Sequence, residues 1–322
     1  DFYRTGKYVK KNINKVIHYY LLSACKDNPK SLFQLGAIYD DGTFVKKDIF
    51  KAINYYSRAA ELNYAPAQTA LGLIYFQAIY VQRDINKAIN YMYQAAENKY
   101  APAQYYLGEL YTNGYFLVKI DIKKAIYYYT LAAGQNHLDA QFNLGVIYSA
   151  KNEFQDIQKS IYYYTLAADQ NDHRAQYNLF CMYEEGILVK QDIEKAIRYL
   201  ILSASQSDQI AQYTLGHFFY DGKYFKKDVD KAIYFLSLSA QQNMPEAQCF
   251  LGCIYIRGEY VQRDIVKAIN YFSLAANQKH ADSLFNLGCI YSDTDIGMED
   301  INKAIHYFSL AANQNHADSL YR

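Results

Sequence analysis

Apolar residues in this chain follow a helical spacing in short segments. In residues 64–99, one set of apolar residues recurs at offsets of 0, 4, 7 and 8 from Ala67, which is the spacing of one face of an α-helix. A second set follows at offsets of 1, 4, 5, 8, 11 and 12 from Asp84 and also falls on one stripe. The pattern therefore predicts two amphipathic helices joined by a short polar loop.

The same pair of segments returns with a period of 36 residues, which slips once to 37 and once to 35. The string Asp-Ile-x-Lys-Ala-Ile marks the second helix, and its first position is Asn12, Asp48, Asp84, Asp121, Asp156, Asp192, Asp228, Asp264 and Asp300. A leucine marks the first helix at Leu35, Leu71, Leu107, Leu144, Leu179, Leu215, Leu251 and Leu287. A fixed period of this length is typical of stacked repeat proteins. The sequence predicts an all-α fold, an α/α superhelical solenoid of stacked antiparallel helix pairs.

Glycine follows the marker leucine in seven of the eight copies, although glycine weakens a helix interior. Close approach of the second helix explains this recurrence. Phe180 stands in the remaining copy, where the larger side chain would let the pair splay. The other recurring positions are the aspartates, which are preferred N-caps, and polar turn residues suited to the left-handed conformation, namely Asn63, Asn136, Asn171, Asn243 and Asn315.

The positions of the prolines and of the loop glycines support this assignment of the repeats. The four prolines, Pro29, Pro66, Pro102 and Pro245, are predicted in the turn before a first helix. Six glycines share one position in the loop between the two helices, Gly6, Gly42, Gly114, Gly186, Gly222 and Gly258. We expect residues 1–322 to form one continuous array of about eight full helix pairs. The first unit is truncated to its second helix and the last is cut in its first helix, as in an excerpt of a longer array.

The composition of the chain excludes some classes of function. Lys and Arg number 33 against 32 Asp and Glu, a net charge of +1 that argues against a nucleic-acid-binding protein. No apolar run approaches the ~20 residues of a membrane span. The five cysteines are odd in number and form no recurring pair, so we expect free thiols and a cytoplasmic location.

These motifs resemble the Sel-1-like repeat family, a relative of the tetratricopeptide repeat. The family signature runs Ala-x-x-x-Leu-Gly-x-x-Tyr-x-x-Gly, then Lys-Ala-x-x-Tyr-Tyr-x-x-Ala-Ala. In one unit the matching residues are Ala211, Leu215, Gly216, Phe219, Gly222, Lys231, Ala232, Phe235, Leu236, Ser239 and Ala240. The resemblance covers nearly the whole chain and implies a right-handed superhelix of paired helices.

The resemblance also implies a function, because members of the family are mostly adaptors that assemble protein complexes. We therefore expect a non-enzymatic scaffold, without cofactor or metal, that binds a peptide or protein partner on its concave face. One alternative is the regulatory or targeting arm of a larger enzyme, such as a protein kinase. Another is a penicillin-binding hydrolase of the cysteine-rich branch, whose cysteine pair in each repeat is missing here.

The candidate binding residues form an aromatic column on the first helices, which are expected to line the concave surface. The column comprises Phe33, Tyr105, Phe142, Tyr177, Tyr213 and Phe285. Exposed aromatic rings in a row are typical of a docking strip. The alternative is that these rings pack between successive first helices and complete the core.

Two other columns are assigned to structure. Aromatic residues seven positions after each cap, from Tyr19 to Tyr307, are expected to pack at the edge of the buried stripe. Basic residues before the caps form either a solvated edge or a ridge that attracts an acidic segment. They are Lys46, Lys47, Arg83, Lys226, Lys227 and Arg263.

Overall fold

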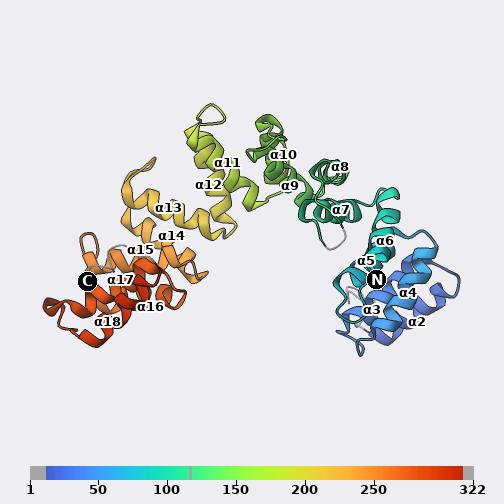
Figure 1. Ribbon diagram of the computed structural model, residues 1–322, viewed down its shortest axis with the longest axis horizontal. Coiled ribbons are helices and arrows are strands. Elements are labelled where there is room, and N and C mark those ends of the chain that lie inside the picture. The colour runs from blue at the N-terminus through green and yellow to red at the C-terminus, as the bar shows by residue number, and fades with distance from the viewer. Residues whose placement is uncertain (1–11, 116–117, 315–322) are drawn as a thin grey trace. The chain divides into compact units, whose positions relative to one another are not determined.

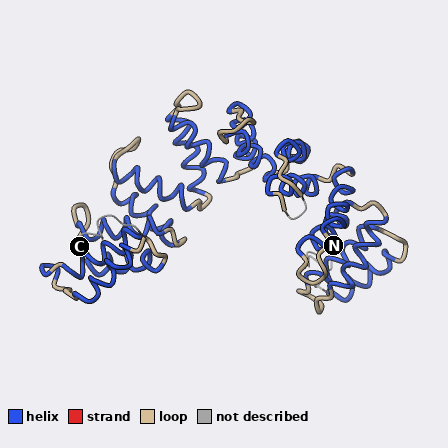
Figure 2. The backbone as a smooth tube through the Cα atoms, in the orientation of Figure 1, coloured by secondary structure: helices blue, strands red, loops and turns tan. Residues whose placement is uncertain are grey.

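The computed structural model describes residues 12–115 and 118–314, and all regular structure in these residues is helical (Figures 1 and 2). The first helices of the repeats are α3 (Pro29–Asp41), α5 (Ala65–Gln77), α7 (Ala101–Asn113), α9 (Leu138–Ser149), α11 (His173–Glu185), α13 (Gln209–Asp221), α15 (Pro245–Arg257) and α17 (Ala281–Ser292). The second helices are α2 (Ile13–Ala24), α4 (Ile49–Glu61), α6 (Ile85–Glu97), α8 (Ile122–Ala133), α10 (Ile157–Asp169), α12 (Ile193–Ser205), α14 (Val229–Gln241), α16 (Ile265–Asn277) and α18 (Ile301–Ala312). A short 3₁₀ helix, η1 (Thr294–Ile296), precedes α18.

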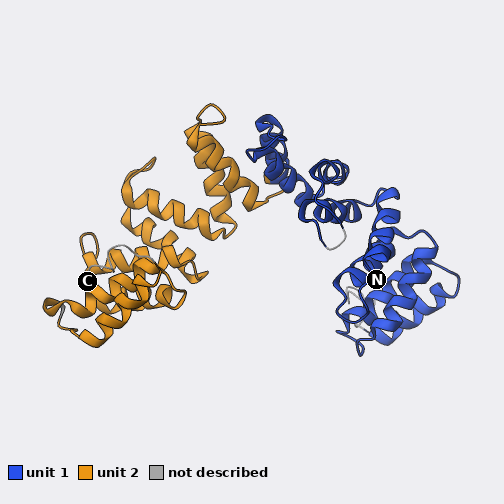
Figure 3. Cartoon of the chain, in the orientation of Figure 1, with its two compact units in different colours: residues 1–167 blue, residues 168–322 orange. Residues whose placement is uncertain are grey.

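In the helix pairs from α3/α4 to α17/α18, the first helix packs on the second helix that follows it (Figure 1). Second helices also pack on the next first helix, as α4 does on α5 and α12 does on α13. The predicted stacking of antiparallel helix pairs is confirmed. The chain forms two compact units, residues 1–167 and 168–322 (Figure 3). No helix among the described residues has both the length and the apolar character needed to cross a membrane.

The aspartates cap the second helices as predicted. In α4, the Asp48 carboxylate accepts a hydrogen bond of 3.0 Å from the backbone N–H of Lys51. The backbone N–H of Asp48 also donates to the carbonyl of Tyr39 at 2.9 Å, which ties the start of α4 to the end of α3. The second bond returns in every later unit, so the cap residue also closes the loop between the two helices.

The turn residues behave largely as predicted. Asn63, Asn136, Asn171 and Asn243 have φ between 57° and 65°, in the left-handed region, while Asn315 lies outside the described residues. Five loop glycines, Gly42, Gly114, Gly186, Gly222 and Gly258, also have positive φ, and Gly6 lies outside the described residues.

The expected position of the prolines was wrong by one or two residues. All four lie inside the first turn of their helices, where the missing N–H has no intrahelical partner in any case.

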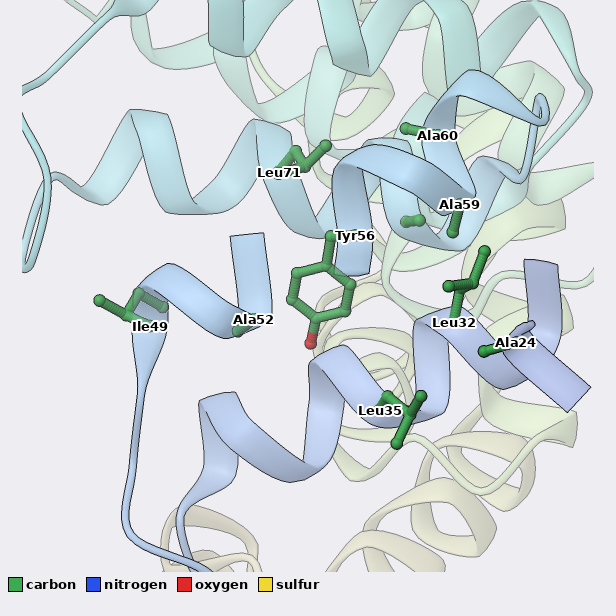
Figure 4. Packing of buried hydrophobic residues seen from close by; sticks show 10 residues of the cluster. Ala24, Leu32, Leu35, Ile49, Ala52, Tyr56, Ala59, Ala60 and Leu71 are labelled. Carbon is green, nitrogen blue, oxygen red and sulfur yellow. The ribbon is translucent and has the colours of Figure 1, made fainter. Parts of the chain in front are cut away.

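The interior of each unit lies between the glycine of the first helix and the residue eight positions after the cap. A Cβ built on Gly36 would lie 2.6 Å from the ring of Tyr56, so close packing explains the glycine as predicted. Figure 4 shows the Tyr56 ring projecting from α4 over α3, beside the buried Leu35. Alanines at the end of α4, Ala59 and Ala60, let the next first helix approach closely.

The substitution of Phe180 does not splay its pair, contrary to the expectation. Helices α11 and α12 contact each other as extensively as the helices of the other units. The Phe180 ring packs on the Phe218 ring of α13, with ring centroids 6.1 Å apart, and is buried. Leu200 stands eight positions after the cap of α12, where most units have a tyrosine or phenylalanine that faces the first-helix glycine. Leucine is smaller than either residue.

The second aromatic column packs as predicted from Tyr55 to Tyr307, whereas its first member, Tyr19 of α2, is 54% exposed. In each of these units, the ring of the column stacks on an aromatic ring near the end of the first helix. The centroids of Tyr55 and Tyr39 are 5.9 Å apart, and the angle between their ring planes is 11°. The lysine three positions after the cap places its ammonium over the first-helix ring, at 5.3 Å for Lys51 and Tyr39. The same lysine contact occurs in all eight units, so it is a structural cation–π interaction.

Successive repeats are also joined by buried glutamines. Gln212 donates to the carbonyl of Ala204 at the end of the preceding second helix, at 3.2 Å. Its own amide oxygen accepts a hydrogen bond of 2.9 Å from Gln242 of the following turn. The donated bond recurs at Gln68, Gln104, Gln141, Gln176 and Gln248. Each of these carbonyls also accepts a backbone N–H of the turn, as Ala204 does from Ser207 at 3.1 Å, so the glutamine adds a second bond at the helix C-terminus.

Candidate functional site

The candidate aromatic column is half-buried rather than fully exposed. Each ring contacts aromatic neighbours, as Tyr105 does with Tyr129, with centroids 5.9 Å apart. Phe142 lies 5.9 Å from Tyr164, and Phe285 lies 5.6 Å from Phe308. The rings of the column pack on second-helix rings because the column lies three positions before the glycine that contacts the second helix. Their inner edges complete the core and their outer edges reach the surface.

Two members of the column line pockets, one in each unit. Tyr105 lines a pocket of about 230 Å³ in residues 73–115, and Tyr213 lines another of about 230 Å³ in residues 213–282. No pocket described here is lined by Phe33, Phe142, Tyr177 or Phe285. Of the six candidate residues, the structure therefore places two beside a pocket, and the role of the column in binding stays a prediction.

The Tyr105 pocket is aromatic. It lies between α5 and α7 and is closed by Met92 of α6 and by the loop residue Tyr115. Phe76 and Tyr115 meet edge to face with centroids 5.6 Å apart, and Tyr105 and Tyr106 meet the same way at 5.5 Å. The remaining wall is formed by two leucines, by the amide of Gln77 and by Glu109.

Glu109 is held in place from outside the pocket. Its carboxylate accepts a hydrogen bond of 2.6 Å from the hydroxyl of Tyr129 and one of 2.8 Å from the amide of Asn143. Burial, and then this bond to Glu109, raise the pKa of Tyr129 above its ordinary value, so the hydroxyl remains a donor at neutral pH.

A second pocket of unit 1 adjoins the first, because both share Leu73 and Gln77. Its wall includes Lys47, whose ammonium lies 3.6 Å from Asp40 and 4.7 Å from the centroid of Tyr80. Two of the other basic residues near the caps are similarly engaged. Lys227 lies over Tyr260 at 4.0 Å, and Arg263 donates to the carbonyl of Ile256. These contacts favour the structural interpretation of the basic edge.

The Tyr213 pocket contains a pair of thiols on α15. Hydrogen bonding to Cys253, together with burial, raises the pKa of Cys249, while the same bond lowers the pKa of Cys253. Hydrogen bonding to Cys249 raises the pKa of His280. All five cysteines lie in the described residues and none forms a disulfide. No group of three or more His, Cys, Asp or Glu side chains in the described residues is arranged to hold a metal ion.

His280 and His137 have a structural role that sequence reasoning missed. Their imidazoles cap first helices by accepting from the backbone N–H of Ser283 and Ala140, at 3.3 and 3.4 Å. His316 lies outside the described residues.

The pattern of the Sel1 repeat matches nine consecutive segments of this chain, residues 1–28, 29–64, 65–100, 101–137, 138–172, 173–208, 209–244, 245–280 and 281–316. The chain belongs to the Sel1 repeat family. The boundaries of the family repeat fall at the starts of the first helices described above.

Two solved structures of Sel1 repeat proteins resemble this chain closely. One is a protective antigen present in uropathogenic Escherichia coli strains, with a TM-score of 0.85 and 27% sequence identity. The alignment covers 94% of this chain and 65% of that one, so the chain spans less than two thirds of that protein. The other is a Sel1 repeat protein from Oxalobacter formigenes, with a TM-score of 0.73 and 29% identity over 94% of this chain and 87% of that one. A search of the curated proteins finds no match to this chain.

Proposed function

We propose that this Sel1 repeat chain is a non-enzymatic scaffold that binds a peptide or protein partner on the face of its first helices. The observation that carries the proposal is the placement of two pockets on this face, each lined by a member of the aromatic column. Half-buried aromatic rings are favourable contact residues, because much of their ordering cost is already met before binding.

The second helices provide a contrast within the same molecule. Their outward positions carry tyrosines such as Tyr127, Tyr162 and Tyr234, which are 58–59% exposed. These rings lie on the opposite helices of their pairs and line none of the pockets described above. Exposure alone therefore does not distinguish the proposed binding residues, whereas their position beside a pocket does.

The test is partner capture by matched variants. The chain is used as bait, the recovered protein is purified, and its affinity for the chain is measured by calorimetry. Tyr105→Ala with Tyr213→Ala should weaken this affinity at least about tenfold, as expected for truncated interface anchors. Tyr127→Ala with Tyr234→Ala is the control, since it removes the same atoms from the second helices.

Unchanged affinity in the first variant, with helicity retained by circular dichroism, would remove the first-helix face from consideration. The alternative, that the array is the regulatory arm of a larger enzyme, is tested by reading the full-length coding sequence. A cytoplasmic location is part of the proposal, supported by the odd number of cysteines and their lack of a recurring pair. Cell fractionation tests it directly.

A further inference from the structure

The Tyr105 pocket differs from the corresponding place in every other repeat. It combines Phe76, Tyr106 and Glu109, and the residues equivalent to Glu109 are Ala37, Leu73, Val146, Cys181, His217, Cys253 and Cys289. A loop aromatic such as Tyr115 occurs in other copies one position later, and Tyr260 meets Tyr220 edge to face as Tyr115 meets Phe76. The acidic residue beside these rings is confined to one repeat, so it is not required by the stacking that all repeats share.

The pocket has aromatic walls and one negative charge. Four rings line it, those of Phe76, Tyr105, Tyr106 and Tyr115. No lysine, arginine or histidine is among the described residues that line it, and Glu109 is the acidic one. Aromatic faces attract cations through their quadrupoles, and a nearby carboxylate adds a charge-assisted hydrogen bond.

The charged groups around the pocket leave this preference intact. His137 stacks on Tyr105 with ring centroids 4.7 Å apart, but burial lowers its pKa, so the ring is neutral at neutral pH. The two donors to Glu109, Tyr129 and Asn143, are uncharged. They fix the carboxylate without cancelling its charge.

We propose that this pocket is an aromatic cage that binds the cationic side chain of a lysine or arginine in the partner. The inference rests on the proposed function and names the chemistry of one contact in it. A volume of about 230 Å³ accommodates an ammonium or guanidinium group together with the last methylenes of its stem. Glu109 receives the N–H donors, and the four rings cover the planar or tetrahedral cation.

Methionine labelling gives a direct reporter of the pocket. The chain has four methionines, and Met92 lines the pocket whereas Met182, Met244 and Met298 are in the other compact unit. With ¹³C-methyl methionine, NMR titration follows all four methyl groups at once. The probes are two blocked five-residue Gly/Ser peptides with a central arginine or lysine. Their controls carry citrulline or acetyl-lysine, which keep the shape and remove the charge.

We expect the arginine or lysine peptide to shift the Met92 methyl resonance saturably while the other three stay in place. The uncharged peptides should bind at least about tenfold more weakly. Glu109→Gln keeps an oxygen acceptor for Tyr129 and Asn143 and should cause a similar loss. Tyr115→Leu, at a side chain that is 44% exposed, should weaken binding without affecting the fold. Glu97→Gln, an exposed change of the same charge on α6, should have no effect.

Three results would overturn the cage: no Met92 shift with either cationic peptide, equal binding of the citrulline peptide, or equal affinity in Glu109→Gln and Glu97→Gln. Thermal unfolding of each variant shows that the comparison is made on folded protein. The capture experiment remains separate. If the purified partner still depends on Tyr105 and Tyr213 while the peptides fail, the scaffold function stands and the cation site alone is wrong.

Discussion

A Cβ atom on Gly108 would lie 2.5 Å from Cδ1 of Tyr129, closer than unbonded carbons approach in proteins. The same relationship recurs between the glycine and the ring or aliphatic side chain of the other units, for example between Gly145 and Tyr164 at 2.4 Å. The glycine thus sets how closely the two helices of a repeat pack. This contact orients the first helix, and with it the face that carries both pockets.

Gly108→Ala is therefore expected to destabilise the protein by about 1–3 kcal/mol, the usual cost of overpacking a core. Gly134→Ala is the matched control. Gly134 has helical φ, and its nearest neighbour would be 3.4 Å from the new Cβ, so alanine should be neutral or stabilising by up to about 1 kcal/mol. Urea unfolding measures both. Equal effects of the two substitutions would mean that Gly108 is not a contact residue.

The loop after α5 offers a reciprocal pair of substitutions. Ala78 has a φ of 56° at the position where α15 is followed by Gly258, with a φ of 66°. Ala78→Gly should stabilise the protein by about 0.5–1 kcal/mol by relieving the left-handed strain. Gly258→Ala should destabilise it, because the new Cβ would also lie 2.6 Å from Cβ of Arg263. Thermal unfolding of the two variants should shift in opposite directions, and a shift in the same direction would contradict the assignment.

The glutamine ladder predicts an energetic link between repeats. Gln212→Leu keeps the size of the side chain but leaves the carbonyl of Ala204 and the amide of Gln242 without this partner. Because the Ala204 carbonyl keeps its bond from the backbone N–H of Ser207, the expected loss is about 0.5–1.5 kcal/mol in urea unfolding. Gln241→Leu, at the exposed neighbouring helix end, should change stability by less than about 0.5 kcal/mol. A neutral Gln212→Leu would show that the ladder is dispensable, as in the repeats that carry Leu32 and Leu284 there.

The capping aspartates predict acid sensitivity. The backbone N–H of Lys231 holds the pKa of Asp228 below its usual range, and Asp48, Asp156 and Asp300 are lowered in the same way. Because the folded pKa is the lower one, the stabilisation is present above the unfolded pKa of about 3.9 and is lost as the pH falls through the folded pKa.

Replacing these four aspartates by asparagine should keep the caps, since Asn12 caps α2 through the same bond. The variant should lose less thermal stability between about pH 4 and pH 2 than the parent protein. Thermal unfolding across this range measures the difference. Identical acid dependence would assign the loss to other groups.

The features that could be predicted from the sequence are those that recur in every repeat. Leu144 and its equivalents, the Asp48-type caps and the Gly36-type contacts each follow from a local rule applied at the same position many times. Each rule is weak at a single position, but its recurrence in every repeat fixed the boundaries of the predicted helices. The Gln212 ladder recurs as well, in an Ala-Gln pair, but the bond partner of a polar residue on a helix depends on the neighbouring repeat and has no signal of its own.

The pocket of the proposed binding face was harder to predict because it depends on residues that do not repeat. Phe76, Tyr106, Glu109 and Tyr115 come from two helices and a loop, and only packing brings them around one pocket. The aromatic column included Tyr105 because it was periodic, and it missed the others for the same reason. The sequence left open whether the column is exposed or completes the core, and the structure shows its six aromatic residues half-buried.

The orientation of the first helix decides which residues would face the proposed partner, and Leu144 and Val146 of α9 test this orientation directly. Leu144 is fully buried and Val146 is 40% exposed. In urea unfolding, Leu144→Ala should cost about 2–5 kcal/mol, the penalty for truncating a buried leucine, and Val146→Ala less than about 0.5 kcal/mol. A loss below about 0.5 kcal/mol for Leu144→Ala, or a larger loss for Val146→Ala, would contradict the assignment of the buried and the binding faces.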